Sequence, residues 1–154
     1  MTELDSINCD QLKHLNCGCN LLTSLDLTNN CQLELLGVSN NNFSEQELSW
    51  LSHLVNLKEL YLRNDDQEKI KQGIYNRFVG SLKFLKEANK LERLDINDTD
   101  IDSGIEYLPY SLNNYFRCSA KQRPEAKVKA IEQKLKTEAQ AQKHKPKPKP
   151  KSDE

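Results

Sequence analysis

The residues best suited to chemistry in this sequence are its cysteines. Four of the five lie near the start of the chain, at Cys9, Cys17, Cys19 and Cys31. Cysteine thiolates at close spacing can bind zinc or form a redox pair. His14 lies close enough in the sequence to serve as the base for a Cys19 nucleophile. Which chemistry is possible depends on where the surrounding element points each side chain.

That element is part of a repeat. When the chain is shifted by 21 residues, LDSINCDQLKHLNCGCN (4–20) aligns with LDLTNNCQLELLGVSNN (25–41). The shared core is Leu-x-x-Leu-x-(Leu/Val/Cys)-x-x-Asn, and its five copies start at Leu12, Leu33, Leu57, Leu91 and Leu112. The last copy, LNNYFRC, has one extra residue after its leucine, which places Phe116 and Cys118 at the apolar positions.

This core resembles the leucine-rich repeat, a family whose units of about 20–29 residues stack side by side. Each Leu-x-Leu predicts a short strand with its apolar residues on one face, and stacked units share one core. The resemblance implies an α/β fold over residues 1–118: a short solenoid of about five repeats with a parallel concave sheet and an irregular or helical convex side. Asn20 and Asn41 are expected to form a ladder of side-chain hydrogen bonds at the turns. The stretch LDINDTDIDSGIEYLPYSLNNYFRC also resembles intracellular leucine-rich repeat proteins of expanded fungal gene families.

The long step between the third and fourth copies predicts an insertion. The asparagine of the third copy is due at Asp65, but the Asn-x-Phe pattern appears only at Asn76. Removing residues 65–75 restores an ordinary repeat length, so we expect a surface loop there. The alternative is a longer helical segment over residues 66–88. Elsewhere on the convex side we expect helices over 44–54, with a capping box at Ser44 and Glu47, and over 81–89.

The C-terminal part differs in composition from the repeats. Residues 121–154 hold 11 Lys or Arg against 5 Asp or Glu, whereas residues 1–120 hold 11 against 18. We expect a capping helix over 119–138, whose helical pattern begins near Pro124 and extends to Lys143. Docking of this helix into a partner is the alternative. Residues 139–154 are expected to be a disordered Lys/Pro-rich tail, with basic residues at Lys145, Lys147, Lys149 and Lys151.

The repeat register argues against a chemical site at the cysteines. Cys17 takes the same inward position as Val38, whereas Cys19 falls at an exposed position and is expected to be the only accessible thiol. The two thiols would face opposite ways, so neither a metal site nor a disulfide is expected. The acidic stretch from Asp95 to Glu106 lacks the spacing of a calcium loop. The sequence also has no glycine-rich phosphate loop, so we expect no enzyme activity, no cofactor and no metal.

The concave face is the expected binding surface. Its outward strand positions carry the candidate contacts, of which Tyr61, Arg63 and Arg93 are favoured because tyrosine and arginine dominate interface hot spots. Asp95 and Asp98 are both expected to be exposed there. The full set of candidates is His14, Asn16, Leu35, Lys58, Tyr61, Arg63, Arg93 and Asp95.

The function predicted from these features is a non-catalytic module that binds another protein on the concave face. One alternative is a recruiting or regulatory arm of a signalling or ubiquitin-ligase assembly. Another is an electrostatic tether that acts through the Lys/Pro tail on an acidic or nucleic-acid partner. Sequence-specific nucleic-acid binding is not expected, because no aromatic residue is interleaved with the tail lysines. No signal peptide and no membrane span are expected. Together with the odd number of cysteines, this favours a reduced, cytoplasmic protein, and we expect it to be a monomer.

Overall fold

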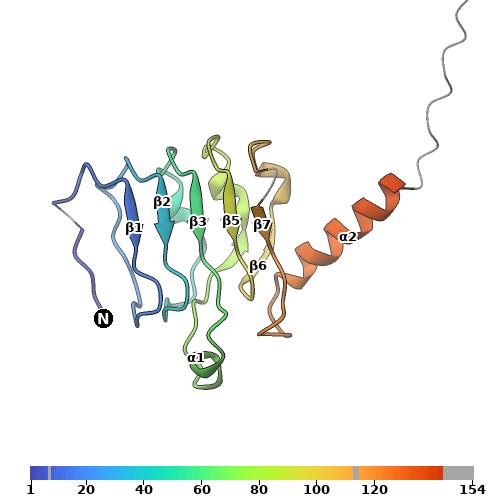
Figure 1. Ribbon diagram of the computed structural model, residues 1–154, viewed down its shortest axis with the longest axis horizontal. Coiled ribbons are helices and arrows are strands. Elements are labelled where there is room, and N and C mark those ends of the chain that lie inside the picture. The colour runs from blue at the N-terminus through green and yellow to red at the C-terminus, as the bar shows by residue number, and fades with distance from the viewer. Residues whose placement is uncertain (7, 113–114, 144–154) are drawn as a thin grey trace, which may run out of the picture.

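The computed structural model describes residues 1–6, 8–112 and 115–143. Five short strands lie side by side in one parallel sheet in the order β1, β2, β3, β5 and β7 (Figure 1). Their bounds are His14–Asn16, Leu35–Gly37, Glu59–Tyr61, Arg93–Asp95 and Tyr115–Arg117. One strand comes from each of the five sequence repeats, which confirms the short solenoid expected from the sequence.

The register of the sheet follows the repeat alignment. Leu15, Leu36, Leu60, Leu94 and Phe116 occupy equivalent positions on the five strands. The three central leucines of this row are fully buried, whereas the two end members are partly exposed because each has a neighbour on one side only. The extra residue in LNNYFRC therefore lies before β7, and Phe116 points inward as expected.

Two buried asparagines tie their turns to neighbouring repeats. Asn41 donates from Nδ2 to the carbonyls of Cys17 (3.0 Å) and Val38 (2.9 Å), and its Oδ1 accepts from the main chain of Leu22 (3.0 Å). Asn76 repeats this pattern one unit further on, donating to Val38 at 2.8 Å and accepting from Phe43. Asn76 is thus the structural equivalent of Asn41. The eleven-residue offset inferred from the sequence is seen directly.

The segment between Asp65 and Tyr75 leaves the solenoid as a loop that carries α1, Gln67–Lys71 (Figure 1). Asp66 caps this helix by accepting a hydrogen bond from the main chain of Lys69. At the base of the loop, the Asn64 side chain donates to the Asn76 carbonyl (2.9 Å) and accepts the Asn76 N–H (2.8 Å). The loop prediction is right, and a long helix over 66–88 is wrong.

The convex side contains more extended chain than the sequence suggested. The helix expected over 44–54 is only a 3-10 turn, η1, at Ser49–Leu51, and the one expected over 81–89 is η2, Leu82–Leu85. A third turn, η3, spans Ile105–Tyr107. A second parallel sheet pairs β4, Val79–Ser81, with β6, Asp100–Ser103.

The Ser44–Glu47 capping box does not form. The Ser44 N–H instead donates to the Thr23 carbonyl, and Gln46 makes a bridge to Phe78. These contacts continue the ladder of the second sheet toward the N-terminus, so the main-chain groups near Ser44 are satisfied by neighbouring repeats rather than by a helix.

The C-terminal helix α2 spans Lys129–Lys143, so it begins later than the pattern after Pro124 predicts. Residues before it form turns, held in part by the Val128 N–H donating to the Thr99 carbonyl. Ala126, Val128 and Ile131 are buried against the last repeats, and the rest of α2 extends away from the solenoid (Figure 1). The four tail lysines, Lys145, Lys147, Lys149 and Lys151, lie outside the described residues.

Candidate protein-binding surface

The solvent-facing side chains of the five-stranded sheet form a surface that we call the strand face. Alternation along each strand and the parallel register align these side chains in rows. One row contains His14, Leu35, Glu59, Arg93 and Tyr115. The next row contains Asn16, Gly37, Tyr61, Asp95 and Arg117. All eight candidate residues lie on or beside this face, although they are not equally accessible.

At the edge of the face where the strands begin, Glu34 pairs with two lysines. The Lys58 Nζ lies 2.8 Å from Oε2 of Glu34, and the Lys13 Nζ lies 3.7 Å from Oε1. The hydrogen bond from Lys58 lowers the pKa of Glu34, and the same bond raises the pKa of Lys58. The charge of Lys58 is therefore largely balanced within the chain.

Asp95 is not the exposed contact that the sequence predicted. Its side chain is only 2% exposed, and its Oδ2 lies 3.2 Å from Nη1 of Arg63. Arg63 also pairs through Nε with Asp65 at 2.9 Å. Burial lowers the pKa of Arg63, but the hydrogen bond to Asp95 and the charges of Asp65 and Asp95 outweigh it, so the pKa is raised overall. Arg63 thus covers Asp95 and remains partly exposed itself.

Beside this ion pair lies a cluster of aromatic rings and guanidinium groups. The Tyr61 and Tyr115 rings meet edge to face with centroids 6.4 Å apart. The guanidinium carbons of Arg93 and Arg117 lie 5.4 and 4.9 Å from the Tyr115 centroid. The Tyr61 hydroxyl donates to Glu59 at 2.6 Å. The pKa of Tyr61 is raised, mainly by burial and to a smaller extent by this hydrogen bond.

Tyr115 and Arg117 were not among the eight candidates. The signal that identifies them is the inward assignment of Phe116, because alternation then turns both of its neighbours outward. Tyr115 pairs in register with Arg93, and Arg117 with Asp95. The strand face is therefore richest in tyrosine and arginine across β3, β5 and β7.

Across β1 and β2 the strand face is hollowed. A hollow of about 350 Å³ is bordered by Asn16, Gly18, Cys19, Gly37, Ser39, Asn40, Tyr61 and Arg63. Its floor is low because Gly18 and Gly37 carry no side chain. The Asn16 side chain leans over Gly37, where an added Cβ would come within 2.9 Å of the amide oxygen. Tyr61 and Arg63 thus border both the hollow and the arginine–tyrosine cluster.

Solved structures share this arrangement of strands. Internalin C2 from Listeria monocytogenes superposes with a TM-score of 0.58 at 21% identity, over 77% of this chain and 47% of the other. The leucine-rich repeat ectodomain of the receptor kinase SOBIR1 from Arabidopsis thaliana gives 0.53 at 25% identity, over 75% and 58%. The chain folds as a leucine-rich repeat solenoid. It spans about half the length of these two structures.

No protein-family model and no curated protein matches the chain. The narrower resemblance to fungal leucine-rich repeat proteins therefore stays a prediction. Within the described ranges, no helix is long and apolar enough to cross a membrane.

The leucine-rich repeat register places the thiols of Cys17 and Cys19 in different environments. Cys17 is buried, and burial raises its pKa, while Cys19 is exposed in a left-handed turn with φ of 57°. Cys9 and Cys31 are exposed as well, so the prediction that Cys19 is the only accessible thiol is wrong. Among the described residues, no three His, Cys, Asp or Glu side chains are grouped so that they could hold a metal ion.

Asp98 was also expected on the exposed face, and it is buried. Its Oδ1 accepts from the main-chain N–H groups of Gln122 and Arg123, both at 2.8 Å. Burial raises the pKa of Asp98, against the lowering effect of these two donors. Asp98 therefore joins the fourth leucine-rich repeat to the C-terminal segment and is not available to a partner.

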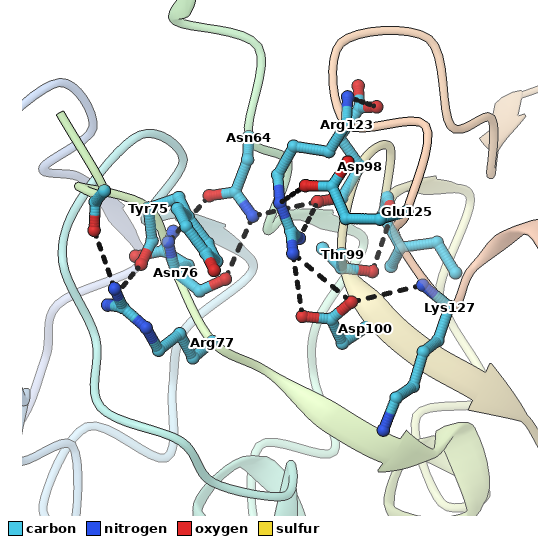
Figure 2. Close-up of polar contacts among 12 residues, drawn as sticks. Asn64, Tyr75, Asn76, Arg77, Asp98, Thr99, Asp100, Arg123, Glu125 and Lys127 are labelled. Carbon is cyan, nitrogen blue, oxygen red and sulfur yellow. Dashed lines mark hydrogen bonds and ion pairs between the residues drawn. The ribbon is translucent and has the colours of Figure 1, made fainter. Parts of the chain in front are cut away.

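Arg123 is the centre of the polar cluster shown in Figure 2. Its guanidinium group donates to the Asp98 carbonyl (2.8 Å) and to Asp100 Oδ2 (3.1 Å), and it lies 4.0 Å from the centroid of the Tyr75 ring. Arg77 approaches the same ring, at 4.4 Å. The inserted loop, the fourth leucine-rich repeat and the start of the C-terminal segment thus meet in one buried cluster with a structural role.

Proposed function

We propose that this chain is a non-catalytic protein-interaction module that binds its partner through the strand face. The observation that carries this proposal is the cluster of Tyr61, Arg93, Tyr115 and Arg117 on adjacent strands. Tyrosine and arginine supply most hot spots of protein interfaces, and a sheet holds them in fixed positions. The leucine-rich repeat fold supports the same role in general, because stacked repeats present extended surfaces for binding.

A protein fits this surface better than a nucleic acid does. Nucleic-acid interfaces need a continuous basic patch. On the strand face, acidic side chains alternate with basic ones along the row Lys13, Glu34, Lys58 and Glu92. The partner we propose is therefore a protein, recognised by a monomer of this chain. The exposed thiols of Cys9, Cys19 and Cys31 support a reducing, cytoplasmic setting.

The test compares Tyr61→Ala with Tyr110→Ala as a matched control, since Tyr110 is 96% exposed and lies outside the strand face. Proteins captured from lysate by the wild-type chain and by the control are quantified by mass spectrometry, and those lost with Tyr61→Ala are purified for titration. We expect Tyr61→Ala to weaken such a partner by about tenfold or more.

A third variant separates binding from folding. Tyr61→Phe keeps the ring that contacts Tyr115 and removes only the hydroxyl that donates to Glu59. It should retain most of the binding if the ring is the anchor. Equal capture of every partner by the wild-type chain and Tyr61→Ala would sink the proposal.

A further inference from the structure

We propose that β3, β5 and β7 bind an acidic peptide segment, whose carboxylates are recognised by Arg93 and Arg117. This inference rests on the proposed function, because it names the chemistry of the partner at the same surface. Both arginines are exposed on the strand face. Neither forms an ion pair with any residue that the structure describes.

The carboxylates nearest to these arginines in the register are engaged elsewhere. Glu59 pairs across the strands with Arg93, but its Oε2 accepts the Tyr61 hydroxyl at 2.6 Å. Asp95 pairs across the strands with Arg117. Its Oδ2 is bound by Arg63 at 3.2 Å, and its Oδ1 accepts the main-chain N–H of Asn97 at 3.1 Å. The sheet therefore places two acidic groups beside two arginines and leaves both guanidinium groups without an ionic partner.

Tyr115 holds the two guanidinium groups in place. Both lie within cation–π distance of its ring, at 5.4 Å for Arg93 and 4.9 Å for Arg117. A guanidinium group has five N–H donors, and contact with a ring leaves donors that can bind a carboxylate in a bidentate manner. Because the rotamers are already restricted by Tyr115, less conformational entropy is lost when a partner binds.

Arg93 and Arg117 differ from the lysines on the other half of the strand face because neither has an ion-pair partner among the described residues. On the other half, Lys13 and Lys58 are both paired with Glu34. Next to Arg93, a hollow of about 330 Å³ is bordered by Glu92, Arg93, Ser111 and Tyr115. Glu92 also contributes to the raised pKa of Lys58, after the larger effects of Glu34. The two unpaired guanidinium groups, rather than the net charge of this half, thus favour a partner that brings its own carboxylates to Arg93 and Arg117.

The test uses the full chain and random short peptides displayed on phage. Wild type is compared with Arg93→Gln/Arg117→Gln and with Lys83→Gln/Lys86→Gln, which removes the same charge from exposed residues at η2. The Lys/Pro tail is present in every variant, so its attraction for acidic peptides is common to all of them. We expect peptides selected on wild type to be enriched in Asp and Glu. They should keep their affinity for the lysine variant and bind the arginine variant about tenfold more weakly.

Arg93→Lys/Arg117→Lys keeps the charges but loses bidentate geometry, so it should lie between wild type and the glutamine variant. Selected peptides that are neutral or basic, or acidic peptides that bind the arginine variant as well as wild type, overturn the inference, as does a selection that enriches nothing. The proposed function fails separately. Non-acidic peptides whose binding is lost with Tyr61→Ala would support the strand face as the binding surface and exclude an acidic ligand. Peptides whose binding is unchanged by Tyr61→Ala and by the arginine substitutions would contradict the proposed function.

Discussion

The guanidinium group of Arg123 donates to the main-chain carbonyl of Asp98, and the Asp98 carboxylate accepts the main-chain N–H of Arg123, both at 2.8 Å. This reciprocal pair connects the fourth repeat to the segment that leads into α2. Asp98 adopts a left-handed conformation with φ of 58°, as do Cys19 and Asn40 at equivalent turns. Asn40 likewise accepts two N–H groups, from Asp65 and Asp66. At two places along the solenoid, a residue in the left-handed conformation thus joins successive segments by accepting two main-chain N–H groups with its side chain.

The acceptor, rather than the charge, is expected to be the important property of Asp98. Asp98→Ala leaves the N–H groups of Gln122 and Arg123 without their acceptor and should lower the free energy of unfolding by about 2–3 kcal/mol. Asp98→Asn keeps an oxygen at the same place and should cost less than half as much. Urea denaturation of the three proteins measures both values. Equal losses for the two variants would contradict this account.

The raised pKa of Asp98 predicts the pH dependence of the asparagine variant. The folded chain holds the Asp98 proton more tightly than the unfolded chain does, so the contribution of Asp98 to stability is greatest at low pH. It is lost as the pH rises from the unfolded pKa through the folded pKa. The stability of Asp98→Asn relative to wild type should therefore be higher at about pH 7 than at about pH 3. The opposite trend would mean that the main-chain donors outweigh burial.

The asparagine ladder should show graded sensitivity to alanine. Asn41 and Asn76 are fully buried and satisfy main-chain groups of two repeats, so each alanine variant should lose about 2–3 kcal/mol of unfolding free energy. The Asn20 side chain is partly buried and donates to the carbonyls of Cys17 and Gly18 in its own turn, so its loss should be smaller. Asn89→Ala, at an exposed position, serves as the control. Chemical denaturation gives the ranking, and equal effects at all four sites would contradict it.

Two glycines with positive φ should respond differently to alanine. An added Cβ at Gly104 would meet Ser81 Oγ and come within 2.6 Å of the Leu82 main-chain nitrogen, whereas the space around Gly73 is open. Gly73→Ala carries only the conformational cost, about 1 kcal/mol. Gly104→Ala adds a steric clash with the start of η2. It should lower the melting temperature several times as much as Gly73→Ala does. Thermal unfolding of both variants tests this difference, and similar melting temperatures would argue against the packing at Ser81.

Thiol labelling tests the register in solution. Cys9, Cys19 and Cys31 are exposed and should react quickly with iodoacetamide, whereas Cys17 is buried. Burial also raises the pKa of Cys118 to about 11, so little thiolate forms at neutral pH. Cys17 should label only when the chain unfolds, whereas Cys118, which is partly exposed, should label slowly in the folded chain. Peptide mapping by mass spectrometry identifies the sites, and rapid labelling of Cys17 would reverse the assignment of inward and outward positions.

The periodic features were predictable from the sequence, and the features that depend on contacts between repeats were not. Leu60 and Phe116 could be assigned inward because repeat spacing and alternation set their positions on each strand. The burial of Asp95 depends on Arg63, which comes from another repeat, and no local pattern reveals that pairing.

The convex side shows the same limit. Leu48, Leu51 and Leu54 are spaced as on a helix and are all buried, but the chain around them forms only a 3-10 turn. Hydrogen bonds of Gln46 to the main chain of Arg77 and Val79 favour extended chain just before that turn. Tertiary pairing therefore overrides the local helical pattern at this segment.

The closure of the inserted loop by Asn64 and Asn76 has a consequence for how the protein can change. Since the loop leaves and re-enters the stack at one point, its length is decoupled from the pitch of the solenoid. Asp65, Asp66, Lys69 and Tyr75 bind the loop to neighbouring repeats and to Arg123, so changes of sequence or length that keep the register of the strands are confined to the other loop residues, such as Gln72 and Gly73. New sequence added at the tip of this loop would lie at the end of the strand face and would leave the strands of the sheet unchanged.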